Sequence, residues 1–240
     1  MSKKIWTITG DKFLSIEQVS KLISYLEDQK DIALSRNTLQ PVKDYYIVTV
    51  LLQTGLRCFE FCSLKNSDIQ NTKLVVRRGK GNKPRTVLLT KQTAELLKTW
   101  QNYLPQYGYS QDSDAPFMPN RYGGFNSTRA IRYRVKKALK AASLPSHLSV
   151  HSLRHTNCSL LLETKKVSLA RIRDNLGHSS INIVNIYAHA VGNLDEVDLF
   201  DSISDFSKKS EQVNTKKELN TRKKVRAYTR KRKEKGTNWI

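Results

Sequence analysis

Residues 151–155 of this 240-residue chain read His-Ser-Leu-Arg-His, and they lie near the start of a helix predicted over 149–163. His151 and Arg154 are three residues apart, so on a helix both side chains can face one target. Side chains that could act together with these two occur in three other places: Leu176-Gly-His178, Tyr187 nine residues beyond that histidine, and Thr54-Gly-Leu-Arg57-Cys-Phe-Glu60.

These residue types are suited to attack on a phosphodiester. Arginine guanidinium groups bind phosphate oxygens through paired donors and stay charged at any working pH. Histidine exchanges a proton near neutral pH, and Lys80, at the tip of a predicted hairpin, can protonate a leaving oxygen. A tyrosine hydroxyl becomes a nucleophile once its proton is removed and the phosphate is held. The set therefore suits phosphodiester cleavage without a metal, provided that the fold brings the residues together.

In order and spacing, the motifs resemble the tyrosine recombinase (phage integrase) family over residues 13–190. The matching pieces are Thr54-Gly-Leu-Arg57-x-x-Glu60-x-x-x-Leu64, Gly79-Lys80-Gly-Asn-Lys83, His151-x-Leu-Arg154-His155, Leu176-Gly-His178-Ser-Ser and Ile186-Tyr187-Ala-His189. Each piece alone is a weak signal, whereas all of them in this order are specific. The resemblance implies an α-rich α+β fold, the tyrosine recombinase catalytic domain, with helices around a small antiparallel hairpin or sheet.

The resemblance also implies roles for the residues that would act on the phosphate. Tyr187 would attack it, forming a 3′-phosphotyrosyl link and releasing a 5′-hydroxyl. Arg57 and Arg154 would hold the non-bridging oxygens and stabilise the charge of the transition state. His178 would donate to the same phosphate.

The remaining roles concern proton transfer and support. Lys80 would protonate the departing 5′-oxygen, with Lys83 as the alternative in the same turn, and His151 would help to move the tyrosine proton. Glu60 and His155 are expected to support the site rather than react. Neither a cofactor nor a metal is expected, because a metal ion between His151 and His155 would lack acidic and cysteine ligands.

Composition independently favours a nucleic-acid partner. The chain has 42 Lys and Arg against 21 Asp and Glu, a formal charge of +21, which suits a polyanion and nucleic acid over a membrane surface. Its first residues, Met1-Ser-Lys-Lys-Ile-Trp6, lack the apolar run of a secretory signal, and the sequence has no apolar run of the roughly 20 residues that cross a bilayer. Its three cysteines have no disulfide-framework spacing, and we interpret Cys58 and Cys62 as buried packing residues. We therefore expect a cytoplasmic protein on DNA, from a prokaryote, a virus or a plasmid.

Much of the positive charge lies in residues 207–240, which carry 13 Lys and Arg against 3 Asp and Glu, a net +10. With few apolar residues and no helical stripe, this segment is predicted to be a disordered tail that binds phosphates. A solubilising tail and a basic address signal are the alternatives. The expected DNA-contacting residues of the hairpin and the tail are Lys83, Arg85, Arg222, Lys223, Lys224, Arg226, Arg230, Lys231, Arg232 and Lys233.

We expect one catalytic domain over 1–206, without an N-terminal core-binding domain, as in the small fimbrial-switch invertases that the chain resembles. The acidic, amphipathic segment 193–206 is expected to dock on a neighbouring protomer, with packing on its own domain as the alternative. A capping box at Ser15 and Gln18 starts the first predicted helix. Further helices are expected from Pro41 to about Gly55 and over 57–64, 91–103, 127–142, 149–163, 168–175 and 181–190, and strands over 73–78 and 85–89.

The resulting hypothesis is a site-specific DNA recombinase that works as a homotetramer on two DNA sites, through a Holliday junction, in integration, excision or inversion. Off DNA it can be a monomer, and accessory DNA-bending proteins can assist it. Two other functions remain open: type IB topoisomerase-like nicking and closing with the same residues, and a DNA-binding regulator with an idle site. Strand exchange between two marked duplexes separates the first two functions, and the complete catalytic set argues against the third.

Overall fold

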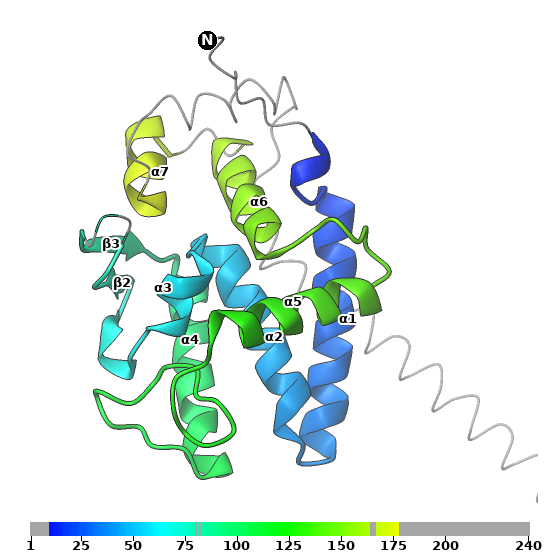
Figure 1. Ribbon diagram of the computed structural model, residues 1–240, viewed down its shortest axis with the longest axis vertical. Coiled ribbons are helices and arrows are strands. Elements are labelled where there is room, and N and C mark those ends of the chain that lie inside the picture. Colours follow the sequence, from blue (N-terminus) through cyan, green and yellow to red (C-terminus); the bar gives the residue numbers. More distant parts are fainter. Residues whose placement is uncertain (1–9, 80, 82, 164–166, 178–240) are drawn as a thin grey trace, which may run out of the picture. The chain divides into compact units, whose positions relative to one another are not determined.

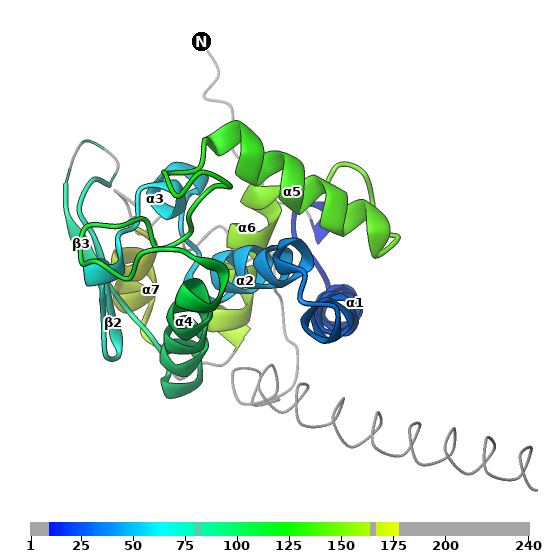
Figure 2. The same cartoon turned by 90° about the horizontal axis from the view of Figure 1, so that it is seen from below.

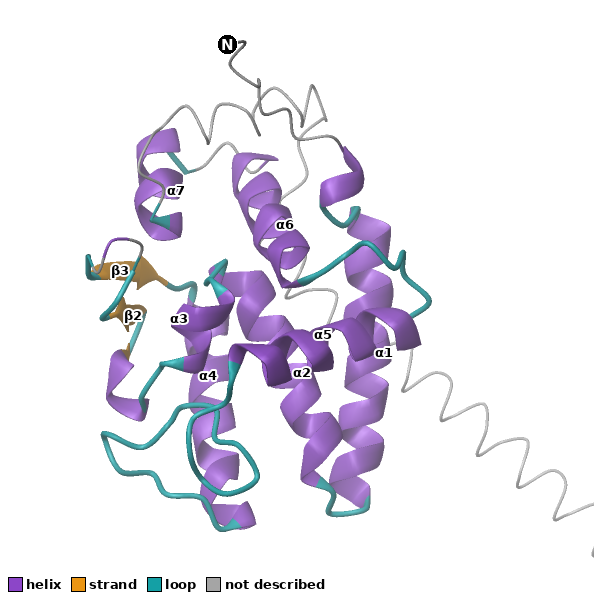
Figure 3. Ribbon diagram, in the orientation of Figure 1, coloured by secondary structure: helices purple, strands orange, loops and turns teal. Residues whose placement is uncertain are grey.

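The computed structural model describes residues 10–79, 81, 83–163 and 167–177, all within the first of two units of the chain, Met1–Phe200 (Figure 1). The elements, in chain order, are α1 (Ile16–Ser35), α2 (Leu39–Thr54), α3 (Cys58–Cys62), β1 (Ile69–Gln70), β2 (Lys73–Val76), β3 (Arg85–Leu88), α4 (Lys91–Tyr103), α5 (Thr128–Ala141), α6 (Val150–Glu163) and α7 (Leu169–Leu176), with 3-10 helices at Gly10–Lys12, Asn66–Asp68 and Leu104–Tyr107. Helices therefore dominate this part, beside a small antiparallel sheet (Figure 3), which confirms the predicted α-rich α+β class. None of the described helices is long and apolar enough to cross a membrane.

Helix α2 forms the centre of the core. It lies between α1, α4, α5 and α6 (Figure 2), and its side chains are buried on nearly every side. The predicted capping box starts α1, with Ser15 accepting from the Gln18 backbone N–H and Gln18 accepting from that of Ser15. Helix α2 begins at Leu39, earlier than expected, because Pro41 fits the first turn, where a missing N–H breaks no helical hydrogen bond.

The sheet has the order β1-β2-β3, and both pairs of strands are antiparallel. Strands β2 and β3 form the predicted hairpin, with Leu74 opposite Val87 and both side chains buried. Strand β1 was not predicted, because two residues are too short to show a period. The turn between β2 and β3 includes Lys80, which lies outside the described residues.

The later helices follow the predicted pattern closely. Helix α4 coincides with the helix expected over 91–103, and α5, α6 and α7 differ from their expected bounds by one residue at each end at most. The long loop before α5 is tied to the core by Trp100, whose buried indole N–H donates to the Phe117 carbonyl at 2.7 Å. The helix expected over 181–190 lies outside the described residues.

Candidate functional site

Arg57 stands at the N-cap of α3, two residues after the glycine that ends α2. Gly55 has a φ of +61°, and a Cβ atom there would come within 2.6 Å of both Asn157 Oδ1 and Leu176 Cδ2. A glycine is therefore required both by the backbone conformation and by the close approach of α6 and α7. The sharp exit from α2 places Arg57 next to these two helices.

Glu60, one turn into α3, holds Arg57 and Arg85 together. Its fully buried carboxylate accepts from Arg57 Nη1 at 2.9 Å and from the Arg57 backbone N–H at 2.8 Å. It also accepts from Arg85 Nη1 at 2.7 Å and Arg85 Nη2 at 2.9 Å. Burial by itself would raise the pKa of Glu60, but the hydrogen bonds and charges of the two arginines outweigh it and lower the pKa to about 2. Glu60 is thus a charged anchor at neutral pH.

Arg85 differs from its expected role as a DNA-binding residue. Its side chain is 11% exposed, both terminal nitrogens donate to Glu60, and Nε donates to the Asn175 carbonyl at 2.9 Å. The prediction counted Arg85 as one more cation of an exposed hairpin, but its position in β3 turns the guanidinium inward, towards the buried carboxylate. We therefore correct its assignment to a residue that positions Glu60 and α7.

Helix α6 contributes Arg154, which is almost completely buried. Its Nη1 donates to the Gly55 carbonyl and its Nη2 to the Leu176 carbonyl, both at 2.5 Å. A buried guanidinium needs acceptors for its N–H groups, and these two carbonyls come from the end of α2 and the end of α7. Arg154 therefore connects α6 with the ends of α2 and α7.

His151 lies one turn before Arg154, at the surface of α6. Partial burial lowers its pKa, and the positive charges of Arg132, Arg154 and Arg57 lower it further. These effects favour the neutral form of the imidazole, which can accept a proton. Arg57 and Arg154 are thus near enough for their charges to act on His151.

His155 lies one turn after His151 and is more deeply buried. Burial, with the charges of His151, Arg154 and Lys12, lowers its pKa to about 4. Within the described ranges, no group of three or more His, Cys, Asp and Glu side chains is placed to hold a metal ion.

Three arginines converge on the C-terminal end of α7. Arg85 donates to the carbonyl of Asn175, Arg154 to that of Leu176, and Arg57 to that of Gly177, the last at 3.1 Å. The last carbonyls of a helix have no partners within the helix and carry partial negative charge, so cations stabilise this end. The hydrogen bonds hold the end of α7, as far as Gly177, against the three arginines.

A family model described as the phage integrase family matches residues 12–193. The chain belongs to the phage integrase family. Among curated relatives, tyrosine recombinase XerC of Caldanaerobacter subterraneus subsp. tengcongensis is 34% identical over 165 residues, 68% of this chain and 46% of the relative. XerC of Corynebacterium glutamicum is 35% identical over 158 residues, 65% of this chain and 50% of the relative. The chain thus spans about half the length of the curated relatives it matches.

Solved structures agree with this membership at the level of the fold. The crystal structure of XerA recombinase matches with a TM-score of 0.60 and 24% identity, over 80% of this chain and 64% of XerA. A lambda integrase tetramer bound to a Holliday junction matches with a TM-score of 0.57 and 19% identity, over 82% of this chain and 53% of the integrase chain. At these identities the likeness establishes the fold alone.

In this family member, the described residues bring together Arg57, His151 and Arg154, with Glu60 and His155 as immediate neighbours. Lys83 is exposed in the turn between β2 and β3, and its carbonyl accepts from the Gly79 N–H at 3.0 Å. The other predicted site residues lie outside the described part of the chain: Lys80, His178, Tyr187, Arg222, Lys223, Lys224, Arg226, Arg230, Lys231, Arg232 and Lys233.

Sequence reasoning missed Arg132, on the exposed side of α5. Its charge acts on both His151 and Cys58, so this guanidinium belongs to the same cluster in the integrase domain. A signal was available, because Ile131 and Val135 face the core at helical spacing and turn position 132 outwards. The sequence of α5 alone, however, does not show which residues from other elements lie near Arg132.

Proposed function

We propose that this chain is a site-specific DNA recombinase that cleaves and rejoins DNA through a 3′-phosphotyrosyl intermediate and exchanges strands through a Holliday junction. One observation carries the proposal. Arg57 and Arg154, about 100 residues apart, donate to neighbouring carbonyls at the end of α7, beside a histidine whose pKa both arginines lower. Two fixed guanidinium groups and a neutral imidazole are the groups that a phosphodiester cleavage site needs.

In the proposed mechanism, Arg57 and Arg154 bind the non-bridging oxygens of the scissile phosphate. Their guanidinium groups are already oriented by Glu60 and by backbone carbonyls, so little reorganisation is needed as charge develops in the transition state. His151, kept neutral by its positive neighbours, accepts the proton of the attacking hydroxyl.

Three residues outside the described part complete the proposed reaction. Tyr187 attacks the phosphorus and takes over the 3′-phosphate, while Lys80 gives a proton to the departing 5′-oxygen. His178, which follows the glycine at the end of α7 in sequence, donates a hydrogen bond to the same phosphate. The phosphotyrosyl link keeps the energy of the broken bond, so rejoining needs no ATP.

The proposed assembly is a homotetramer on two specific double-stranded DNA sites. The solved relatives include XerH bound to a difH substrate and a lambda integrase tetramer bound to a Holliday junction, and these relatives support DNA as the partner and four subunits as the working form. We also propose that the acidic segment 193–206 docks on a neighbouring protomer, and that the tail over 207–240 binds DNA phosphates. Accessory DNA-bending proteins are further candidate partners of this assembly.

A nicked suicide DNA substrate, from which the released end diffuses away, tests the proposed nucleophile. Wild-type protein should become covalently attached to DNA, and Tyr187→Phe should not, because it lacks the attacking hydroxyl. Tyr133→Phe, which alters a tyrosine that is 69% exposed on α5, is the matched control and should still attach. Attachment by Tyr187→Phe, measured as a DNA-protein band on a denaturing gel, would mean that another residue is the nucleophile.

Strand exchange between two differently labelled duplexes then tests the reaction type. A recombinase should produce hybrid duplexes and a junction intermediate from two sites. An enzyme of the topoisomerase type would relax a single supercoiled circle but give no hybrids, and that result would contradict the recombinase proposal.

A further inference from the structure

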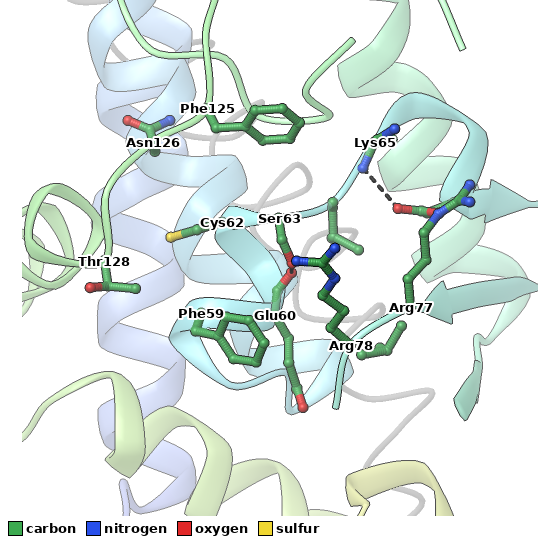
Figure 4. A pocket seen from close by; sticks show the side chains of 13 residues that line it. Phe59, Glu60, Cys62, Ser63, Lys65, Arg77, Arg78, Phe125, Asn126 and Thr128 are labelled. Atoms are coloured by element: carbon green, nitrogen blue, oxygen red, sulfur yellow. Dashed lines mark hydrogen bonds and ion pairs between the residues drawn. The ribbon is translucent and has the colours of Figure 1, made fainter. Parts of the chain in front are cut away.

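An open cavity of about 470 Å³ lies beside the candidate site, between α3, β2 and the segment that leads into α5 (Figure 4). Its lining includes the buried apolar side chains of Leu64 and Val76. Phe59 and Phe125 lie on opposite sides of the cavity, and they are 43% and 46% exposed. Small-ligand pockets have volumes of about 300–1,000 Å³, and exposed apolar groups that gather around such a hollow indicate a binding groove.

The cavity also corrects the interpretation of the two cysteines of α3. Cys58 is buried as expected, whereas Cys62 is half-buried and lines the cavity, with its sulfur towards Thr128 (Figure 4). The interpretation of both as buried packing residues is therefore wrong for Cys62.

One cation of the lining is open to a charged ligand. Two other cations, Lys65 and Arg77, are already paired with carboxylates, at 2.7 and 2.5 Å, and the buried carboxylate of Glu60 is bound by the arginines of the candidate site. Arg78 is exposed, and it forms no ion pair within the described ranges. Its side chain extends between the two phenylalanine rings in Figure 4. A guanidinium group binds a phosphate through paired donors, so the cavity offers a place for one phosphate beside two aromatic rings.

The cavity adjoins the residues that act on the scissile phosphate in the proposed reaction. Glu60 lines it and holds Arg57, which binds a non-bridging oxygen of that phosphate in the proposed mechanism. Arg78 precedes Lys80, the proposed donor to the departing 5′-oxygen, by two residues, so the chain keeps their Cα atoms within about 7 Å of each other. A strand that leaves from Lys80 therefore starts next to this cavity.

We propose that this cavity binds the terminal nucleotide of the released 5′-hydroxyl strand, with the base stacked on Phe59 and the following phosphate on Arg78. The inference rests on the proposed function and names a ligand within it, an unpaired nucleotide instead of the duplex. Grooves that combine cations with exposed aromatic side chains are typical of sites for single-stranded nucleic acid.

Cleavage creates the state that such a site recognises. Within a duplex each base is paired and stacked, so its ring faces are not available to a protein side chain. Once the strand is cut, its terminal base can leave the stack, and unstacking costs least for a base that has already lost its partner. The cavity would then retain the 5′ end close to the phosphotyrosyl link, ready for rejoining.

Rejoining by an added strand tests the proposal on the full chain. The covalent complex on suicide DNA is mixed with a single strand whose 5′-hydroxyl oxygen bonds to phosphorus, while the bond to Tyr187 breaks and the proton passes to the tyrosine oxygen. Phe59→Ala should raise the strand concentration for half-maximal rejoining by about 10-fold, with a smaller effect on the maximal rate, because stacking contributes to strand binding. Phe59→Trp should restore the wild-type value. Tyr133→Ala, which removes an exposed ring from α5, is the matched control and should behave like wild type.

A strand without its first base tests the contact itself. Removing the base should weaken strand binding in the wild type, and this loss should be about 10-fold smaller in Phe59→Ala, because the stacking partner is already absent. Equal losses in the two proteins would contradict the proposal, and so would equal half-maximal concentrations of the intact strand.

Photo-crosslinking decides the cavity without any cleavage. A short single strand with 5-iodouracil as its first base is irradiated with the full chain, and peptide mapping should find an adduct on Phe59 or Phe125. The absence of both adducts would overturn the proposal. A synthetic peptide of residues 193–206 that binds wild type but not Phe59→Ala, with no strand adduct at either ring, would assign the cavity to that acidic segment instead. If the protein never attaches to suicide DNA, the proposed function fails, while crosslinking still shows whether the cavity binds an unpaired nucleotide.

Discussion

Glu60 is the residue on which the geometry of the candidate site depends most. Its carboxylate takes two hydrogen bonds from Arg57 and two from Arg85, with its side chain fully buried. The favourable hydrogen bonds and charges keep it ionised in spite of burial. Removing one partner of such a buried ion pair leaves the other charge without compensation.

Glu60→Gln should therefore lower the free energy of unfolding by about 3–5 kcal/mol, the usual cost of breaking a buried ion pair. The amide would turn an N–H₂ group towards the guanidinium groups that the carboxylate now binds. Denaturant unfolding followed by circular dichroism measures the change. Glu95→Gln, on the exposed side of α4, is the control and should shift stability by about 0.5 kcal/mol or less. Equal stability of the two variants would contradict the anchoring role of Glu60.

His155 should make the protein sensitive to mild acid. Its pKa is about 4 in the folded protein, against an ordinary value of 6.5, mainly through burial. Between these values the unfolded chain binds a proton that the folded chain does not, so stability is lost as the pH falls from about 6.5 towards 4. The slope for one proton is at most about 1.4 kcal/mol per pH unit. Unfolding titrations should show a shallower slope for His155→Gln than for the exposed control His147→Gln, and equal slopes would rule out this cause.

At the scale of elements, the site is a junction of helix ends. The C-terminal end of α2, the start of α3 and the C-terminal end of α7 meet, and arginines from the N-cap of α3, from β3 and from α6 bind carbonyls at the ends of α2 and α7. The C-terminal ends of α2 and α7 provide both the acceptors and the partial negative charge that hold guanidinium groups in place. The junction depends on how closely Gly55 lets α6 and α7 approach.

Gly55→Ala should be more damaging than Gly108→Ala, although both glycines have a positive φ. An alanine in this conformation costs about 1–2 kcal/mol at either position. At Gly108 nothing lies within 4 Å of the added Cβ, whereas at Gly55 the Cβ would come within 2.6 Å of Asn157 and Leu176. We expect Gly55→Ala to lose about 1–3 kcal/mol more through overpacking. Thermal or denaturant unfolding measures the difference. Similar losses of stability in the two variants would show that α6 and α7 can move away from position 55 at little cost, and would contradict this prediction.

At the scale of the whole molecule, the charge of +21 is divided between residues 1–206 and residues 207–240. Several cations of the domain are held by acceptors: Arg57 and Arg85 by Glu60, and Arg154 by backbone carbonyls. The net +10 of residues 207–240 is spread along a segment with few apolar side chains. The arginines held by acceptors suit chemistry at a single phosphate. The charge spread along residues 207–240 suits binding to many DNA phosphates.

Deleting residues 207–240 should weaken DNA binding and make its dependence on salt less steep. For every phosphate that the shortened protein no longer neutralises, the slope of log K against log salt should fall by about 0.9 on duplex DNA. Fluorescence anisotropy at several salt concentrations measures both quantities. A full-length control in which the 13 Lys and Arg of the tail are replaced by Gln should behave like the deletion. An unchanged slope in either protein would remove the tail from the binding surface.

Local patterns were enough to predict most elements. Helices α4 to α7 lie where their apolar spacing and capping residues indicate, and the Ser15–Gln18 capping box starts α1. Apolar spacing and capping residues each involve only a few consecutive residues, so they can be recognised in the sequence. The two-residue strand β1 and the early start of α2 were missed, because β1 is too short to show a period and because Pro41 can lie within the first turn of a helix instead of starting it.

The order of amino acids was sufficient to identify the family, the helical pattern and Arg57, His151 and Arg154 as candidate catalytic residues, because spacing along the chain carries that information. The three-dimensional arrangement was needed to show that Arg85 pairs with Glu60 instead of facing outwards, that Arg132 joins the cluster, and that Cys62 lines a cavity. An arginine on a strand or a cysteine on a helix has the same sequence signature whether it meets a buried carboxylate, a phosphate or water. Its role follows from which distant group lies within hydrogen-bonding distance, and folding alone sets that distance.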